Sequence, residues 1–358
     1  MRRQFTLGAN VDREGHACCD LKFFQPNILG SSISSTATVS STATAARDFA
    51  LRFAAPVPAG SLHGASTAEV EVARKSRQEA TAAGYSSIYT QCLFQLVGGL
   101  HLGMNWKLDA EWSLRDLNPT GAPGFYPSLE LQKEALRSMK TSLKYSMSRY
   151  AQMGDGVLHA KVAMEIAGPP GNVTFLRSEA AVKAGLPVLK WGRIWHGHLS
   201  MGCGVLLPAG RSCPQDRFHL GGASGSYGLK GFAERGAEPR EKCYKVRTEE
   251  LKDNKDANVE REHYDAQGGE AMASLFAAVS TPCDFLRVEG AQLLAFGTCG
   301  ILQRSLQKRG EKLRMSVGGG IALPLGPGTL ELTFAQPLRC SSTDVLQRWQ
   351  LGLRLQFE

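Results

Sequence analysis

The sequence predicts an all-β fold, a sixteen-stranded antiparallel transmembrane β-barrel formed by residues 1–358. Three observations support this prediction. Apolar and polar residues alternate along most of the chain, which is the period of a β-strand. The alternating segments are about ten residues long, close to what a tilted membrane-spanning strand needs. Glycine is frequent, at 39 of 358 residues, and glycine permits the curvature that a closed sheet requires.

The strands are expected in sixteen segments, and this even number suits a closed antiparallel barrel. They lie near residues 3–11, 16–25, 33–43, 47–55, 65–76, 86–98, 100–114, 141–151, 158–168, 172–187, 191–207, 268–282, 287–299, 312–324, 328–337 and 348–357. The last segment shows the alternation most clearly, because Leu351, Leu353 and Leu355 share one face while Gln350 and Arg354 share the other.

A strand with one apolar and one polar face can belong to a soluble antiparallel protein or to a membrane barrel. The soluble protein turns the apolar face to a core, and the barrel turns it to lipid. Aromatic residues lie near strand ends, where membrane interfaces collect them, as at Tyr150, Trp195 and Trp349. Small residues such as Gly318 and Gly320 crowd the polar faces. These features favour the membrane barrel.

Short and long connections alternate along the chain. Two long ones are expected, near residues 115–140 and 208–267, and the second is predicted to fold inward between the eleventh and twelfth strands. Residues 126–140 could form an amphipathic helix, since Leu129, Leu136 and Met139 lie at roughly helical spacing. The alternative for this segment is an additional strand.

Charge, cysteine content and the N-terminus narrow the class of protein. The net charge is +8, but residues 233–268 carry eight basic and ten acidic side chains, so the remaining chain holds about +10 spread over strands and turns. That distribution argues against nucleic acid as a partner, which favours one basic face with interleaved aromatic residues. Nine cysteines without regular spacing fit a reducing compartment. The N-terminal segment lacks the apolar core of a secretory signal.

One motif in the second long connection resembles a known family. Leu220, Gly221 and Gly222 are followed by Leu229, Lys230, Gly231 and Phe232, and this arrangement resembles the loop-six signature of the outer-membrane barrel-assembly superfamily, also called the bacterial surface antigen family. Lys230 stands where that family usually has arginine, so the charge is kept without the bidentate guanidinium.

The mitochondrial branch of this family, the core barrel of the sorting and assembly machinery, is the most similar. The similar segments are residues 21–30, 142–148, 163–168, 172–176 and 316–323. Family members carry a soluble N-terminal POTRA domain, whereas strand one here is expected to begin near Arg3, which leaves no visible room for that domain. The resemblance also implies an acidic partner for Lys230 on the inner wall, and Glu165 and Glu331 are the candidates.

The end of the chain resembles the terminal-strand signal of mitochondrial barrel substrates. The signal has a polar residue, a glycine and two hydrophobic residues at fixed spacing, and Gln350, Gly352, Leu355 and Phe357 fill these places. The resemblance therefore implies that the protein is itself inserted as a barrel. It also places these residues at the gate between the first and last strands, where strand pairing is expected to be weak.

The resemblance implies an insertase in the mitochondrial outer membrane rather than an enzyme. Its partners would be β-barrel precursor proteins, accessory subunits of the assembly complex and the lipid bilayer, with no cofactor and no metal. The alternative is a pore or protein-translocating channel of the same barrel family. Two same-face pairs, His196 with His198 and Glu69 with Glu71, could suggest a metal site or a carboxylate pair, and both are interpreted as structural.

Overall fold

The computed structural model describes most of the chain. The described residues are 4–11, 17–26, 32–42, 47–57, 65–78, 85–100, 103–119, 125–126, 128, 137–191, 193–210, 212–222, 228–245, 264–283, 288–306, 311–325 and 328–355. Phe357 lies outside these ranges, as do residues 223–227 and 246–263 of the predicted inner loop.

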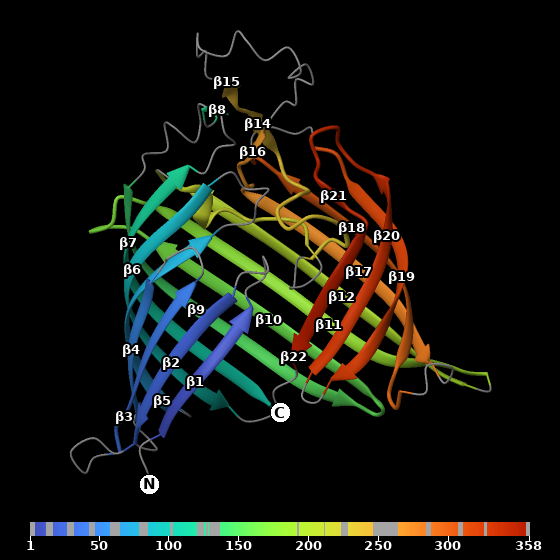
Figure 1. Cartoon of the computed structure of the whole chain (residues 1–358), viewed down its shortest axis with the longest axis horizontal. Helices are drawn as coiled ribbons and strands as arrows, with labels where there is room; N and C mark the ends of the chain where they lie inside the picture. The colour runs from blue at the N-terminus through green and yellow to red at the C-terminus, as the bar shows by residue number, and fades with distance from the viewer. Residues whose placement is uncertain are drawn as a thin grey trace.

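One large antiparallel sheet dominates the fold. Its sixteen strands pair in the order β1-β2-β3-β4-β5-β6-β7-β9-β10-β11-β12-β17-β18-β19-β20-β22, which follows the chain. Figure 1 shows the tilted strands curling around a central space. The prediction of an all-β, antiparallel fold is confirmed. The pairings among the described residues place β1 at one end of the order and β22 at the other.

The strand bounds agree with the expected segments to within five residues, and the largest differences are at β7 and β18. In the first half they are β1 Gln4–Val11, β2 Ala17–Gln25, β3 Ser34–Thr42, β4 Arg47–Pro56, β5 Ala65–Gln78, β6 Tyr85–Leu100, β7 Met104–Pro119, β9 Arg137–Met153 and β10 Gly156–Ala167. In the second half they are β11 Phe175–Trp191, β12 Arg193–Pro208, β17 Ala271–Pro282, β18 Gln292–Gln303, β19 Arg314–Leu325, β20 Gly328–Arg339 and β22 Trp349–Leu355.

The helix considered for residues 126–140 is wrong wherever the structure describes that segment. Tyr126 belongs to the short strand β8, Phe125–Tyr126, and Arg137 begins β9. Residues Arg137 to Thr141 pair with Asp116 to Trp112 of β7, so tertiary strand pairing overrides the local helical spacing. Ser138 and Lys140 are buried, while Arg137 at the start of the strand is exposed. Residues 129–136 lie outside the described ranges.

The two faces of the sheet differ as the alternation predicts. On β10, Val162, Met164 and Ile166 are about half exposed, whereas Ala163 and Glu165 between them are buried. The same contrast runs along β20, where Leu332 and Phe334 are exposed and Thr333 and Ala335 are buried. Apolar side chains therefore face outward over much of the sheet, and the inner face carries small, polar and charged side chains.

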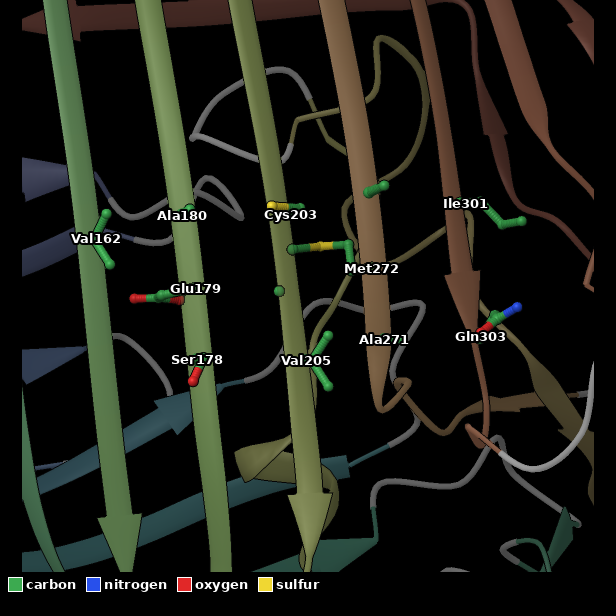
Figure 2. Close-up of a pocket in the computed structure, with 12 residues that line it drawn as sticks. Val162, Ser178, Glu179, Ala180, Cys203, Val205, Ala271, Met272, Ile301 and Gln303 are labelled. Atoms are coloured by element: carbon green, nitrogen blue, oxygen red, sulfur yellow. The ribbon is translucent and has the colours of Figure 1, made fainter.

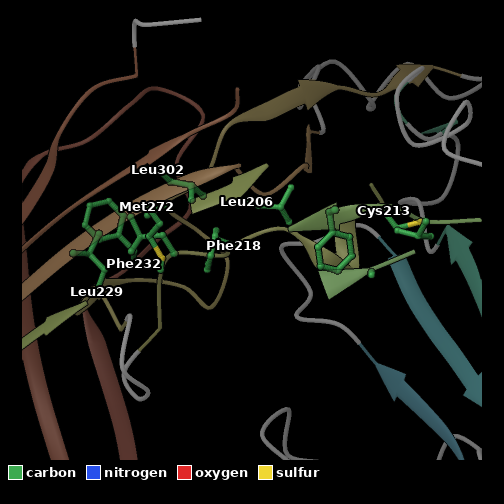
Figure 3. Packing of buried hydrophobic residues seen from close by; sticks show 12 residues of the cluster. Leu206, Cys213, Phe218, Leu229, Phe232, Met272 and Leu302 are labelled. Atoms are coloured by element: carbon green, nitrogen blue, oxygen red, sulfur yellow. The ribbon is translucent and has the colours of Figure 1, made fainter. Parts of the chain in front are cut away.

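The buried hydrophobic core lies where the predicted inner loop packs against the inner face of the sheet. Leu220, Leu229 and Phe232 of the loop contact Leu206 of β12 and Leu302 of β18 in one cluster, which Figure 3 shows from close by. Because these loop side chains are almost fully buried, the loop has a fixed position against the inner face of the sheet.

Short strand pairs stiffen the inner loop. They are β13 Gly231–Phe232 with β21 Leu346–Gln347, β14 Arg240–Lys242 with β16 Tyr264–Ala266, and β15 Tyr244–Lys245 with β8. The described residues include one short 3₁₀ helix, η2 Pro214–Asp216, and none of them forms a helix long and apolar enough to cross a membrane.

Candidate functional site

The tip of the inner loop is held by a buried ion pair. Lys230 Nζ lies 3.1 Å from Glu331 Oε2 of β20, and both side chains are nearly buried, at 7% and 12% exposed. The ammonium group also lies 5.4 Å from the ring centroid of Phe296. Of the two carboxylates considered for Lys230, Glu331 is the partner. Glu165 instead contacts Lys140 at 2.5 Å.

The backbone at the tip requires glycine. Gly231 has φ +91°, and a Cβ there would lie 3.1 Å from Ala335 Cβ and 3.3 Å from Ser316 Cβ. The Ser316 hydroxyl donates a hydrogen bond of 2.5 Å to the carbonyl oxygen of Lys230. The small side chains on β19 and β20 therefore form a shallow seat on which the tip lies directly, and this explains part of the glycine and serine content of the inner face.

Gln350 of β22 holds the other side of the tip. The Gly231 N–H donates to Gln350 Oε1 at 3.2 Å, and Gln350 Nε2 donates to the Phe232 carbonyl oxygen at 2.7 Å. Gln350 is 3% exposed. The sequence pattern places Gln350 in the terminal-strand signal but does not indicate this contact, because Gln350 and Gly231 lie 119 positions apart and no local pattern joins them.

The glycine pair before the tip closes the loop on itself. Gly221 has φ +131°, and a Cβ there would lie 2.4 Å from the Ala233 carbonyl oxygen. The Gly222 N–H donates to the Phe232 carbonyl oxygen at 3.2 Å. The predicted loop-six residues before and after residues 223–227 are thus brought together, with Leu220, Leu229 and Phe232 buried in one cluster.

The terminal-strand residues occupy β22. Gln350 faces inward, and Gly352 pairs with Glu331 of β20. A Cβ at Gly352 would lie 3.9 Å from Glu331 Cβ, an ordinary contact, so this glycine is not required by space. Leu355 pairs through its backbone with Gly328. The role of these residues as an insertion signal stays a prediction.

The start of the inner loop is tied to a different part of the wall. Asp216 accepts two hydrogen bonds from Arg115 of β7, at 2.6 and 3.0 Å. Arg177 of β11 donates to the Asp216 carbonyl oxygen at 3.2 Å and lies 4.3 Å from the ring centroid of Phe218. Sequence reasoning missed this anchor. Its only signal is the alternation that places Arg115 on the inner face of β7.

A second missed contact braces the stem of the loop. Glu238 is fully buried and accepts hydrogen bonds from the N–H groups of Leu220 and Gly268, at 3.1 and 3.2 Å. His219 Nδ1 lies 3.0 Å from the same carboxylate, and its Nε2 lies 3.0 Å from the Pro214 carbonyl oxygen. Glu238 therefore joins the loop at Leu220 to Gly268, where the loop leads into β17.

A buried thiol lies beside this stem. Burial raises the pKa of Cys243 to about 12, and a hydrogen bond with Asp265 adds to the effect. Asp265 also accepts a 2.8 Å hydrogen bond from the Ser128 N–H. Near Cys243, burial lowers the pKa of Arg240, whose guanidinium donates to the carbonyl oxygens of Tyr264 and Arg235.

Glu69, Glu71 and His198 of the two same-face pairs have partners outside their pairs. Glu69 pairs with Arg52 of β4, and Glu71 contacts Lys75 at 2.5 Å. His198 Nε2 lies 3.0 Å from Ser280 Oγ. Within the part of the chain that the structure describes, no three histidine, cysteine or acidic side chains gather as a metal site would require.

A cavity of about 420 Å³ runs across β10, β11, β12, β17 and β18, and Figure 2 shows its lining side chains spread along these neighbouring strands. The lining is largely apolar, and it combines the outward-facing Val162 and Val205 with the buried Met272. Its carboxylate, Glu179, pairs with Lys144 and Arg177. The candidate functional site is therefore the seated loop tip rather than this cavity.

Comparison with solved structures identifies the fold. BamA from Haemophilus ducreyi lacking POTRA domains 1–3 matches with a TM-score of 0.74 and 14% identity, over 98% of this chain and 70% of that one. CdiB from Acinetobacter baumannii matches with a TM-score of 0.58 and 12% identity, over 99% of this chain and 59% of that one. CdiB from Escherichia coli matches with a TM-score of 0.56 and 12% identity, over 99% of this chain and 67% of that one.

Comparison with curated proteins finds no match. A family profile described as the Omp85 superfamily domain matches residues 4–357, nearly the whole chain. The loop-six motif indicated this family from the sequence, and the fold agrees with it. The chain belongs to the Omp85 superfamily.

Proposed function

We propose that the protein is the core subunit of the mitochondrial outer-membrane sorting and assembly machinery. In this proposal it inserts and folds β-barrel precursors through a gate between β1 and β22. The observation that carries the proposal is the seating of the loop tip beside the last strand. Lys230 pairs with Glu331 of β20, and Gln350 of β22 brackets Gly231 and Phe232.

The two faces of the sheet support a location in a membrane. Large apolar side chains are exposed on almost every strand of the sheet, among them Phe94, Leu143, Val162, Met201 and Leu332. Soluble monomers rarely expose contiguous apolar surface on this scale. Lipid would cover this face, and closure of the sheet into a barrel would satisfy the backbone groups of both end strands, as a membrane requires. Family membership supports the outer membrane.

The proposed mechanism uses strand addition. In lipid, an unpaired backbone N–H or C=O costs several kcal/mol, so an edge strand attracts another strand that can pair with it. A precursor strand that enters between β1 and β22 gains that pairing. Further hairpins of the precursor then insert one after another, until the precursor closes into its own barrel and separates from β1 and β22. Folding in lipid supplies the free energy, so the proposal needs no catalytic residue, nucleotide, cofactor or metal.

The mitochondrial assignment rests on residues rather than on the fold. Where the structure describes them, the segments that resemble the mitochondrial branch lie in β2, β9, β10, the turn into β11 and β19. Gln350 and Gly352 occupy the pattern of a mitochondrial terminal-strand signal. The proposed partners are β-barrel precursors, accessory subunits of the assembly complex and the bilayer.

Photo-crosslinking during import tests the proposal. A photoreactive phenylalanine analogue replaces Phe5 of β1 or Leu351 of β22, which are 66% and 68% exposed. The matched control replaces Phe94 on the outer face of β6, at 40% exposed. We expect a radiolabelled precursor with a terminal-strand signal to crosslink at positions 5 and 351 but not at 94. Normal import with no crosslink at either end strand would refute the gate.

A pore or protein-translocating channel of the same family is the second candidate, favoured by the polar inner wall. Lys140 contacts Glu111 and Glu165 across β7, β9 and β10, and Lys144 contacts Glu179 of β11. A channel would show steady conductance in planar bilayers and no crosslink to β-barrel precursors. An insertase whose lumen holds the seated loop would conduct weakly and crosslink at the end strands.

A further inference from the structure

The loop tip is clasped by one continuous segment, residues 345–350, which leads into the last strand. The Ala233 N–H donates to the Val345 carbonyl oxygen, and the Val345 N–H donates to the Gly236 carbonyl oxygen, both at 2.9 Å. The tip strand β13 pairs with β21 inside the same segment. Gln350, the second residue of strand β22, completes the clasp with its side chain.

Within residues 345–350, the Gln350 side chain forms hydrogen bonds with two backbone groups of the tip, the Gly231 N–H and the Phe232 carbonyl oxygen. Its carboxamide offers an acceptor to the Gly231 N–H and a donor to the Phe232 carbonyl oxygen. The amide orientation follows from these partners, because the reverse orientation would set donor against donor and acceptor against acceptor. A carboxylate or an ammonium group could satisfy only one of the two.

The position of Gln350 depends on pairing of the last strand. Gln350 lies opposite Thr333 in the β20–β22 ladder, and the neighbouring Ala335 N–H donates to the Arg348 carbonyl oxygen at 2.8 Å. The other side-chain contacts with polar groups of the tip, from Glu331 and Ser316, come from β20 and β19. They would stay in place if β22 moved, whereas the Gln350 contacts would not.

We infer that Gln350 is a positioning residue that links the seating of the loop tip to pairing of the last strand. This inference rests on the proposed function, since it matters when β22 shifts at the gate. When β22 leaves β20, the buried Gly231 N–H loses the acceptor that Gln350 provides, and the Phe232 carbonyl oxygen keeps the Gly222 N–H but loses the Gln350 donor. Buried unpaired groups are unfavourable, so the tip loosens. Engagement of the edge by a precursor strand is in this way transmitted to the inside of the barrel.

Hydrogen exchange of the full chain in lipid nanodiscs tests the link without any precursor. Gln350→Met keeps the length of the side chain and removes both hydrogen bonds, and Gln350→Asn is too short to make them. We expect exchange at residues 228–236 to quicken about tenfold to thirtyfold in both variants, as the loss of two hydrogen bonds predicts. The matched control is Gln336→Met on the outer face of β20, which should leave exchange at the tip unchanged.

Heat-dependent gel mobility confirms that each variant is folded, so that faster exchange reports the tip alone. Unchanged exchange at residues 228–236 in folded Gln350→Met would overturn the inference. Equal quickening in Gln336→Met would overturn it as well, because the effect would then be general rather than a property of Gln350.

A second arm tests the coupling to the edge with a synthetic peptide of residues 347–355. Its binding is measured by crosslinking to the analogue at position 351. We expect bound peptide to quicken exchange at the tip of the wild-type chain and to add nothing in Gln350→Met, where the tip is already loose. Peptide that binds without loosening the wild-type tip would overturn the coupling. Failure of the peptide to bind would count against the gate itself, and the first arm would still decide the role of Gln350.

Discussion

Removing one charge of the Lys230–Glu331 pair should lower the free energy of unfolding at least as much as removing both charges. The two groups lie 3.1 Å apart and are 7% and 12% exposed, so each neutralises the other in a poorly solvated place. Lys230→Met removes the lysine partner from a nearly buried carboxylate, and breaking a buried ion pair costs about 3–5 kcal/mol. Glu331→Gln leaves the ammonium group beside the rings of Phe276 and Phe296 and should cost about as much. The double variant removes both charges.

A double-mutant cycle measures this coupling. Urea unfolding in lipid, followed by tryptophan fluorescence, gives the free energy of unfolding of each variant. If the pair is buried as described, the double variant loses no more than either single variant, which gives a coupling of about 3 kcal/mol. The control cycle, Lys107→Met with Asp109→Asn, uses a pair of the same length whose lysine is 41% exposed, and should give less than about 1 kcal/mol. Additive losses at Lys230 and Glu331 would refute the buried ion pair.

Three further predictions concern the loop. Because burial raises the pKa of Cys243 to about 12, iodoacetamide should alkylate the exposed Cys340 at pH 9 while sparing Cys243. In the unfolded chain the Cys243 thiol has its ordinary pKa of 9.0. The contribution of Cys243 to the free energy of unfolding therefore falls as the pH rises from 9 towards 12. Gly231→Ala should lower the free energy of unfolding by about 1–2 kcal/mol, since φ is +91° and Ala335 Cβ is 3.1 Å away. Phe232→Ala should lower it by about 3–5 kcal/mol, measured by the same urea titration, because the ring is fully buried.

The fold is largely predictable from the sequence because the same two-residue alternation recurs in every long strand. Apolar side chains lie on the outer face and small or polar ones on the inner face, so Val162 and Leu332 could each be placed on the outer face from their neighbours alone. The exception is the segment 126–140, whose local spacing is roughly helical. Where the structure describes its end, residues from Arg137 onward belong to β9, and pairing with β7 decides the structure.

The candidate site is predictable only where a motif is contiguous. Lys230, Gly231 and Phe232 stand together in the sequence and form the tip. Their partners come from distant strands, and Glu331 could be proposed only by its sign of charge. Arg115 and Asp216 lie 101 positions apart, and no spacing rule connects an arginine on an inner face with an aspartate in a loop. Such contacts depend on the path of the loop, which the strand pattern does not constrain.

The inner loop is anchored at two places, one on the middle strands of the sheet and one on its last strands. This arrangement affects how the proposed gate could open. Its start is tied through Asp216 to β7 and β11, and its tip is tied to β19, β20 and β22. The loop therefore braces the last strands against the middle of the sheet. Opening beside β1 would leave both anchors intact, whereas outward movement of β22 must break the Gln350 contacts while the Lys230–Glu331 pair holds the tip on β20. Under the proposed function, a precursor that displaces β22 would therefore loosen the tip of the loop without releasing it from β20.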